Sequence, residues 1–165
     1  MRLEETVAQL QRRVGELEDR LALMQLLATY GPAVDSGAAE PAAGLWTDDG
    51  VYDVDPEVLR GRAAIAGMVT GEGHQRLIRA GAAHLQGLPH LQVDGDRAVA
   101  TAYSQLVLRD EATDGFRVWR TGVNRWEFTR TPGGWQVTHR TNRQLNGAAE
   151  ARELLYQAVA PPSTG

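Results

Sequence analysis

Three residues of this chain have side chains suited to acid–base chemistry: Tyr30, Asp35 and His84. A histidine can remove a proton next to a carbonyl, or in an elimination, because its pKa lies near neutrality. A carboxylate bound to the other ring nitrogen of such a base fixes its tautomer and stabilises the imidazolium that forms. A tyrosine hydroxyl can donate a hydrogen bond to a developing oxyanion or to a leaving hydroxyl group. These residue types therefore favour proton abstraction.

Each of the three residues also has a purely structural alternative. His84 could be a histidine that only satisfies local hydrogen bonds. Asp35 could cap a turn near Gly37, and Tyr30 could be a core aromatic residue whose hydroxyl binds the backbone.

Tyr30 and Asp35 stand at the end of an apolar stretch, residues 21–37, with few polar positions. This pattern predicts a helix that passes from a surface into an interior. Pro32 lacks the N–H group that would bond to the preceding turn, so a kink or break is expected at Gly31-Pro32. Gly37 is a suitable end for the helix. The expected kink lies between the two polar residues and would help to aim Asp35.

The beginning of the chain carries a heptad pattern. Residues 1–20 form an N-terminal helical extension in this interpretation, and charged residues fill the positions between the apolar ones. The apolar residues form a seam in which the intervals alternate between four and three over about three heptads: Leu3, Val7, Leu10, Val14, Leu17, Leu21 and Met24. This seam suits either an amphipathic helix on its own domain or association with a partner helix.

The rest of the chain predicts an α+β fold. Short helical segments and a short strand precede the long strands at 97–109, 116–130 and 135–145, and a terminal helix covers 148–159. Tight turns between successive strands favour a curved antiparallel sheet with helices on one face, enclosing a cone-shaped pocket. We expect a single domain over residues 1–160, with a disordered tail at 161–165.

Several other side chains are candidates for the pocket wall. Trp46, Tyr103 and Trp119 could line it, although aromatic residues in a small domain are more often core. Strand alternation places Arg140 and Asn142 on one face and His139 on the other. Either face could contact a ligand.

Two further groups are not expected to take part in chemistry. His74 and His90 are expected at the surface or rim. The neighbouring acids Asp48, Asp49, Asp53 and Asp55 match neither a calcium loop nor a zinc pattern, and are expected to form a solvated turn.

Composition excludes several classes of function. The net charge is -4 with no basic block, which argues against nucleic acid and anionic membranes as partners. The chain has no cysteine, so thiolate chemistry and disulfides are excluded. It shows no signal-peptide pattern and no cofactor motif, so we expect a soluble, cytoplasmic protein whose chemistry needs no cofactor or metal.

The order of the motifs resembles the SnoaL-like branch of the nuclear transport factor 2-like superfamily. The resemblance covers residues 15–147 and rests on LEDRLALMQLLATYGPAVDSG, LWTDDGVYDV, GRAAIAGMV, AAHLQGLPHLQVDGDRAVATAY and WEFTRTPGGWQVTHR. Tyr30, Asp35 and His84 are similar in order to the Tyr, Asp and His set of bile-acid 7α-dehydratases. Scytalone dehydratases and hexachlorocyclohexane dehydrochlorinases are similar in the Asp and His. The resemblance implies that Asp35 and His84 form a dyad inside the cone.

The resulting hypothesis is a lyase or isomerase. His84 would remove a proton from a largely apolar, polycyclic or polyketide-like small molecule, Asp35 would orient His84, and Tyr30 would assist the developing or departing oxygen. A cyclase or epoxide-opening enzyme, and a non-catalytic ligand-binding or dimerisation domain, are the alternatives. The open sheet and the N-terminal seam predict a homodimer or homotrimer.

Overall fold

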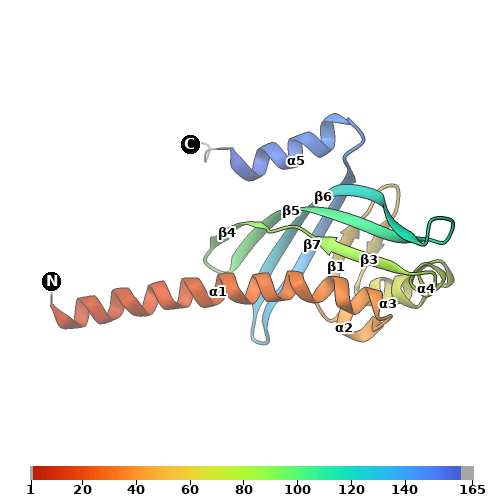
Figure 1. Cartoon of the computed structure of the whole chain (residues 1–165). Coiled ribbons are helices and arrows are strands. Elements are labelled where there is room, and N and C mark those ends of the chain that lie inside the picture. Colours follow the sequence, from red (N-terminus) through yellow and green to blue (C-terminus); the bar gives the residue numbers. More distant parts are fainter. Residues whose placement is uncertain (1, 161–165) are drawn as a thin grey trace.

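Over the described residues, the fold is an α+β arrangement of one curved sheet and five helices. The structure, a computed structural model, describes residues 2–160, so the tail predicted to be disordered lies outside the described residues. Helix α1 (Leu3–Asp35) runs along one face of the sheet, and α5 (Ala149–Val159) lies over the opposite face (Figure 1). The short helices α2 (Ala39–Ala43), α3 (Arg62–Thr70) and α4 (Glu72–Arg79) gather at one end. None of the described helices has the length and apolar character needed to span a membrane.

The seven strands pair in the order β2-β1-β7-β6-β5-β3, with β4 also paired to β5. All of these pairs are antiparallel except β1 with β7, which is parallel and therefore departs from the expected all-antiparallel sheet. The long strands are β5, β6 and β7, as the sequence predicted. The bounds are β1 (Trp46–Asp53), β2 (Val58–Arg60), β3 (Ala82–Gln86), β4 (His90–Asp94), β5 (Arg97–Asp110), β6 (Gly115–Thr131) and β7 (Gly134–Gln144).

Strand β1 contains part of the segment that was expected to form a solvated turn. Asp48 and Asp49 lie inside the strand, where the register to β7 shifts between Trp46 and Val51. The shift explains the turn-like composition, because a β-bulge tolerates residues that a regular strand does not. A side chain on Gly50 would lie 2.7 Å from the Trp46 ring, so the bulge also depends on glycine there.

Helix α1 continues through Gly31-Pro32, so the expected break is absent. The reason for the glycine lies outside the helix. A Cβ atom at Gly31 would lie 2.5 Å from the carbonyl oxygen of His84, so only glycine lets the helix approach β3 this closely. The helix ends at Asp35, and the backbone N–H of Ser36 donates to the carbonyl of Pro32.

The core between α1 and the sheet is rich in aromatic side chains. Trp46 and Trp126 are fully buried, and Tyr30 packs edge-on against both, with ring centroids 5.8 and 5.4 Å away. Leu23 and Leu27 of α1 are buried in the same cluster. Side chains therefore fill much of the cone that the curved sheet would otherwise enclose.

A bidentate ion pair joins β1, β7 and α5. Arg143 donates two hydrogen bonds to the Asp53 carboxylate, at 2.8 and 2.7 Å, and a third to Glu150 at 2.6 Å. Hydrogen bonding from Arg143 lowers the pKa of Asp53 below its ordinary value, against the opposing effect of burial. The pair therefore stabilises the fold only while Asp53 is ionised.

We expect Gly31→Ala to lower the free energy of unfolding by about 1–3 kcal/mol, because the new methyl group collides with a strand backbone that cannot move freely. Urea unfolding measures the change. Gly67→Ala in α3 is the control: nothing lies within 4 Å of its Cβ position, so alanine should stabilise by up to about 1 kcal/mol. Equal effects of the two substitutions would contradict the close approach of α1 to β3.

We expect the stability contributed by Asp53 to be lost in acid. Its folded pKa lies below the unfolded value of about 3.9, so the contribution is present above that value and disappears as the pH falls through the folded pKa. Between about pH 5 and 3, the free energy of unfolding should therefore fall more steeply for the wild type than for Asp53→Asn. Asp49→Asn, an exposed acid on the same strand, should keep the wild-type slope. Parallel slopes for the wild type and Asp53→Asn would refute the contribution of the pair.

Candidate active site

The Asp35 carboxylate holds His84 at two points. Its Oδ1 atom lies 2.5 Å from His84 Nδ1, and its Oδ2 atom accepts a hydrogen bond from the His84 backbone N–H at 2.8 Å. Asp35 is the last residue of α1 and His84 is the middle residue of β3, so the close contact at Gly31 brings them together. Because the carboxylate can only accept, Nδ1 carries the proton and Nε2 remains for a ligand. The structure thus brings together the two residues that the family resemblance paired.

Tyr30 lies on the same helix, one turn nearer the core. It is buried, and its ring centroid lies 6.4 Å from that of His84 in an edge-on arrangement. Both residues line one pocket, so the three candidates for catalysis meet in space.

Arg140 sits in a cage of aromatic rings beside Tyr30. Its guanidinium carbon lies 4.2 Å from the Tyr30 ring, 4.3 Å from Tyr52 and 4.1 Å from Trp126. Each such contact stabilises a cation by about 0.5–2 kcal/mol. Arg140 Nε donates to Asn124 Oδ1 at 2.8 Å, and Asn142 Nδ2 donates to the same oxygen at 2.9 Å. Within residues 2–160, no carboxylate pairs with this buried cation, and its Nη1 atom has no hydrogen-bond partner.

The pocket around these residues is small, and most of its lining is polar. Its cavity volume is about 20 Å³. The lining does not match the expectation of a largely apolar, polycyclic substrate, because Trp46 and Trp126 occupy the apolar part of the cone. The lining residues are Tyr30, Tyr52, His84, Leu85, Gln86, Ser104, Gln105, Leu106, Arg120, Arg140 and Asn142.

The face of β7 that lines the pocket is the one that carries Arg140 and Asn142. Arg140 and Asn142 point inward and are buried, whereas His139 is absent from the lining. Alternation along a strand puts neighbouring residues on opposite faces, which separates His139 from the other two.

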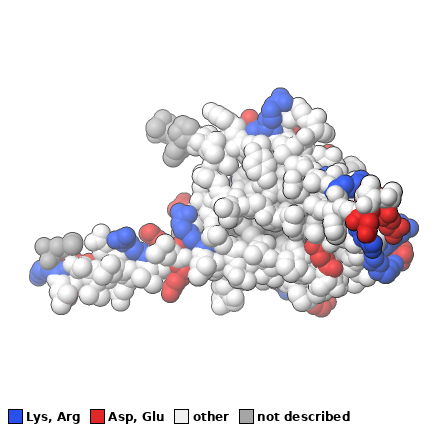
Figure 2. All heavy atoms as spheres, in the orientation of Figure 1, with Lys and Arg blue, Asp and Glu red and all other residues white. Residues whose placement is uncertain are grey.

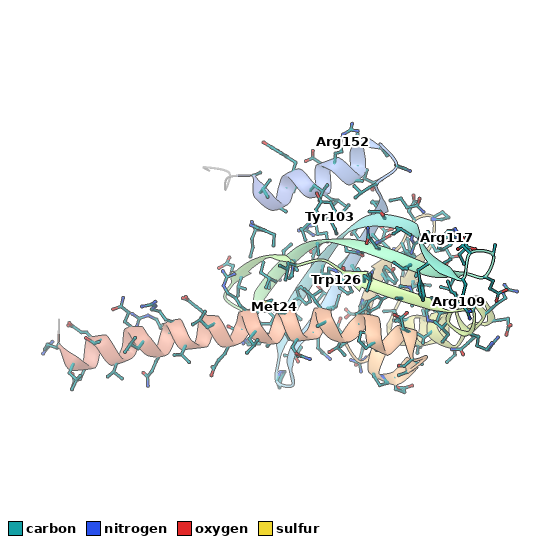
Figure 3. The ribbon with its side chains drawn as sticks, viewed as in Figure 1. Met24, Tyr103, Arg109, Arg117, Trp126 and Arg152 are labelled. Atoms are coloured by element: carbon teal, nitrogen blue, oxygen red, sulfur yellow. The ribbon has the colours of Figure 1, made fainter. Side chains whose placement is uncertain are left out.

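Three aromatic candidates lie elsewhere than the pocket wall. Trp46 is fully buried in the core, behind Tyr30. Tyr103 and Trp119 are about half exposed on the outer face, and Tyr103 lies beneath α5 (Figure 3). Their strand neighbours Ser104 and Arg120 take the inward positions.

Sequence reasoning missed Tyr52, Gln86, Ser104 and Arg120 as lining residues. Burial raises the pKa of Tyr52, so its hydroxyl stays protonated and can donate. One feature of the sequence could have identified Arg120. It lies an even number of residues from Asn124 and Trp126, so strand alternation places the three side chains on the same face.

His74 lies closer to the site than expected. Its ring is half-buried and 5.7 Å from the His84 ring, and its Nε2 atom lies 2.8 Å from the carbonyl oxygen of Val34. A carbonyl only accepts, so Nε2 is the protonated nitrogen of His74. His90, by contrast, is exposed.

Two of the acids along β1 serve as ion-pair partners and do not form the expected solvated turn. Asp53, the last residue of the strand, binds Arg143, and Asp48, near its start, pairs with Arg62 at 3.0 Å. Asp49 is exposed.

Comparison with known proteins agrees with the fold. An NTF2-like protein with a cystatin-like fold from Novosphingobium aromaticivorans is 41% identical, with a TM-score of 0.87, over 90% of this chain and 96% of that chain. A protein of unknown function from Mycobacterium tuberculosis is 24% identical, with a TM-score of 0.72, over 88% and 89%. A hexachlorocyclohexane dehydrochlorinase from Novosphingobium barchaimii is 18% identical, with a TM-score of 0.69, over 81% and 90%. None of the curated proteins matches the chain.

The family model described as a SnoaL-like domain matches residues 15–141, which include Tyr30, Asp35, His84 and Arg140. The resemblance inferred from the sequence motifs is confirmed by this match and by the 41% identical structure. The chain belongs to the SnoaL-like domain family, with an NTF2-like fold.

Proposed function

We propose that this protein is an enzyme that uses His84 as a general base, without a cofactor, on a small molecule. The observation that supports the proposal is the pair of hydrogen bonds that Asp35 accepts from His84, which fix both the backbone and the ring of this pocket-lining histidine and leave its Nε2 atom unengaged by Asp35. A base held in one tautomer and one orientation needs no rearrangement before it accepts a proton.

Charge develops on the substrate as the proton leaves, and the pocket contains groups suited to it. Arg140 and the Tyr30 hydroxyl stand beside His84 in a buried site, where such interactions are stronger than in water. Asp35 stabilises the imidazolium of His84. Asp35 is therefore the partner of the positive charge that forms on His84, and Arg140 and Tyr30 are the partners of the negative charge on the substrate.

The reaction class that follows is a lyase of the dehydratase type or an isomerase. Both begin with proton abstraction, and a dehydrochlorinase among the structures that share this fold is an eliminating enzyme. A cyclase or an epoxide-opening enzyme would use the same residues as acid and base. Product mass separates these classes, because dehydration removes one water and isomerisation or cyclisation leaves the mass unchanged.

One observation favours a non-catalytic binding domain instead. Trp46 and Trp126 fill much of the cone, so the space beside His84 is limited. The substrate that we propose is correspondingly small, and it carries an oxygen-bearing group that the polar lining can bind. Binding of such molecules without any proton exchange would favour the binding domain.

We expect the wild type to catalyse exchange of a substrate C–H proton with deuterium oxide in a panel of small carbonyl and β-hydroxy compounds, followed by NMR. His84→Gln should slow this exchange by about 10²–10⁴-fold, since it removes the base. Asp35→Asn should also slow it, because the amide cannot accept both N–H groups in the same way.

His90→Gln is the matched control, because His90 is an exposed histidine on the neighbouring strand β4. It should exchange protons at the wild-type rate. Near wild-type rates in both His84→Gln and Asp35→Asn would refute the proposed mechanism.

A further inference from the structure

The pocket carries two guanidinium groups and no acid to neutralise them. Arg120 and Arg140 both line it, and neither forms an ion pair with any carboxylate in the described part of the chain. Asp35, which contacts His84 of the lining, is engaged by two hydrogen bonds from that residue. Arg140 is buried, and a buried cation is costly unless it is paired, so the pocket is short of negative charge.

Unpartnered hydrogen-bonding groups point to the same deficit. Within residues 2–160, the buried side-chain atoms without a partner are all N–H donors except one, the amide oxygen of Gln86. Two of these donors belong to residues that line the pocket, Gln86 Nε2 and Arg140 Nη1, whereas Trp46 Nε1, Asn124 Nδ2 and Trp126 Nε1 belong to the core around it. The free N–H groups of Gln86 and Arg140 suit a ligand group that only accepts hydrogen bonds.

We infer that the substrate carries a carboxylate, which binds between Arg120 and Arg140 in the pocket of His84. This inference rests on the proposed function, because it concerns the substrate of that same site. Arginine suits the role, since its planar N–H groups bind carboxylate oxygens with charge-assisted hydrogen bonds. Arg120 also lines the adjoining polar cavity with Asn142, so it stands where the two cavities meet.

The test compares crotonate with crotonamide, which share one carbon skeleton and differ in charge. Binding is followed through the NMR signal of the Trp126 indole N–H, a group next to Arg140. We expect crotonate to bind at least about tenfold more tightly than crotonamide, and Arg120→Leu to remove most of that difference. Arg117→Leu, on the exposed side of the same strand, should leave it unchanged.

Equal binding of the acid and the amide, no binding of either, or equal effects of the two arginine substitutions would overturn the inference. The result is independent of turnover, because His84→Gln should still bind crotonate. Selective crotonate binding together with full activity in His84→Gln would remove the proposed mechanism and leave the carboxylate site in place.

A separate observation concerns the first half of α1, which extends beyond the sheet (Figures 1 and 2). The seven heptad positions, from Leu3 to Met24, are 40% to 79% exposed. The helix packs on its own domain with a different face: Leu23 and Leu27 are buried, whereas Leu21 is 68% exposed. At 3.6 residues per turn the centres of the two faces lie roughly 130° apart around the helix, so the residues that pack on the domain are largely distinct from the seam.

The seam already has the shape that a partner helix needs. A shallow hollow on the helix is lined by Val7, Leu10, Gln11, Val14, Gly15 and Glu18. The first four have the spacing of the hole that accepts a side chain in knobs-into-holes packing. Valine at Val7 and Val14, alternating with leucine at Leu10 and Leu17, is the arrangement that favours two parallel strands.

The flanking charges select the same orientation. On one side of the seam lie Thr6, Arg13 and Arg20, and on the other lie Glu4, Gln11 and Glu18. In a parallel pair the two sides face each other, and Arg13 of one copy meets Glu18 of the other. In an antiparallel pair each side faces itself, which places arginine near arginine and glutamate near glutamate.

We propose that two copies of this chain associate through residues 3–24 of α1 as a parallel coiled coil. Light scattering at micromolar concentration should give the mass of a dimer. Leu10→Glu should give a monomer, whereas Gln9→Glu adds the same charge at a heptad position outside the seam and should remain dimeric. Arg13→Glu should weaken the dimer, and adding Glu18→Arg should restore it.

Orientation is tested by a single cysteine, because the chain has none of its own. Leu3→Cys should form a disulfide-linked dimer on oxidation, since parallel helices bring the two positions together, and Gln9→Cys should not. A monomeric wild type, a dimer that survives Leu10→Glu, or a dimer without the Leu3→Cys cross-link would each overturn the proposal.

Discussion

The contact between the end of α1 and the backbone of β3 determines the geometry of the site. Asp35 can accept both N–H groups of His84 only because the helix lies against the strand, and Gly31 is the residue that allows this. Continuation of the helix through Pro32 then sets the position of Asp35. A residue in the helix interior, chosen for its lack of a side chain, thus controls the orientation of a histidine on another element.

Arg140 gives the pocket its electrostatic character. A buried arginine normally pairs with an acid, but here aromatic faces and one amide oxygen surround it. The rings stabilise the cation without neutralising it, and they leave part of its hydrogen-bonding capacity unused. With Asp35 already engaged, the field in the pocket favours negative charge, whether that charge arrives with a ligand or develops during a reaction.

The sequence predicted the parts of this structure that depend on order and periodicity. The α+β class, the long strands and the family followed from motif order and are confirmed. The wall of the pocket could not be predicted in the same way, because one position along a strand decides whether Trp119 or Arg120 faces inward. The register of β6 on β5 shifts at this point, between the pairs Leu106–Arg120 and Val107–Val118, and the sequence does not indicate such a shift. The continuity of α1 past Pro32 was not predicted either, because the local sequence does not reveal the close contact between Gly31 and the backbone of His84.

Helix α1 presents two apolar faces with unequal constraints. Before Asp19, few of its side chains contact the sheet. Between Leu21 and Met24, the buried residue Leu23 shares one helical turn with the two exposed seam residues. Over evolutionary time the outer part is therefore free to change in length or to be exchanged for another segment, with no effect on the geometry of the Asp35–His84 pair. The shared turn is not free in this way, because a substitution there acts on the core and on the seam together, so it marks the boundary between a replaceable extension and the folded domain.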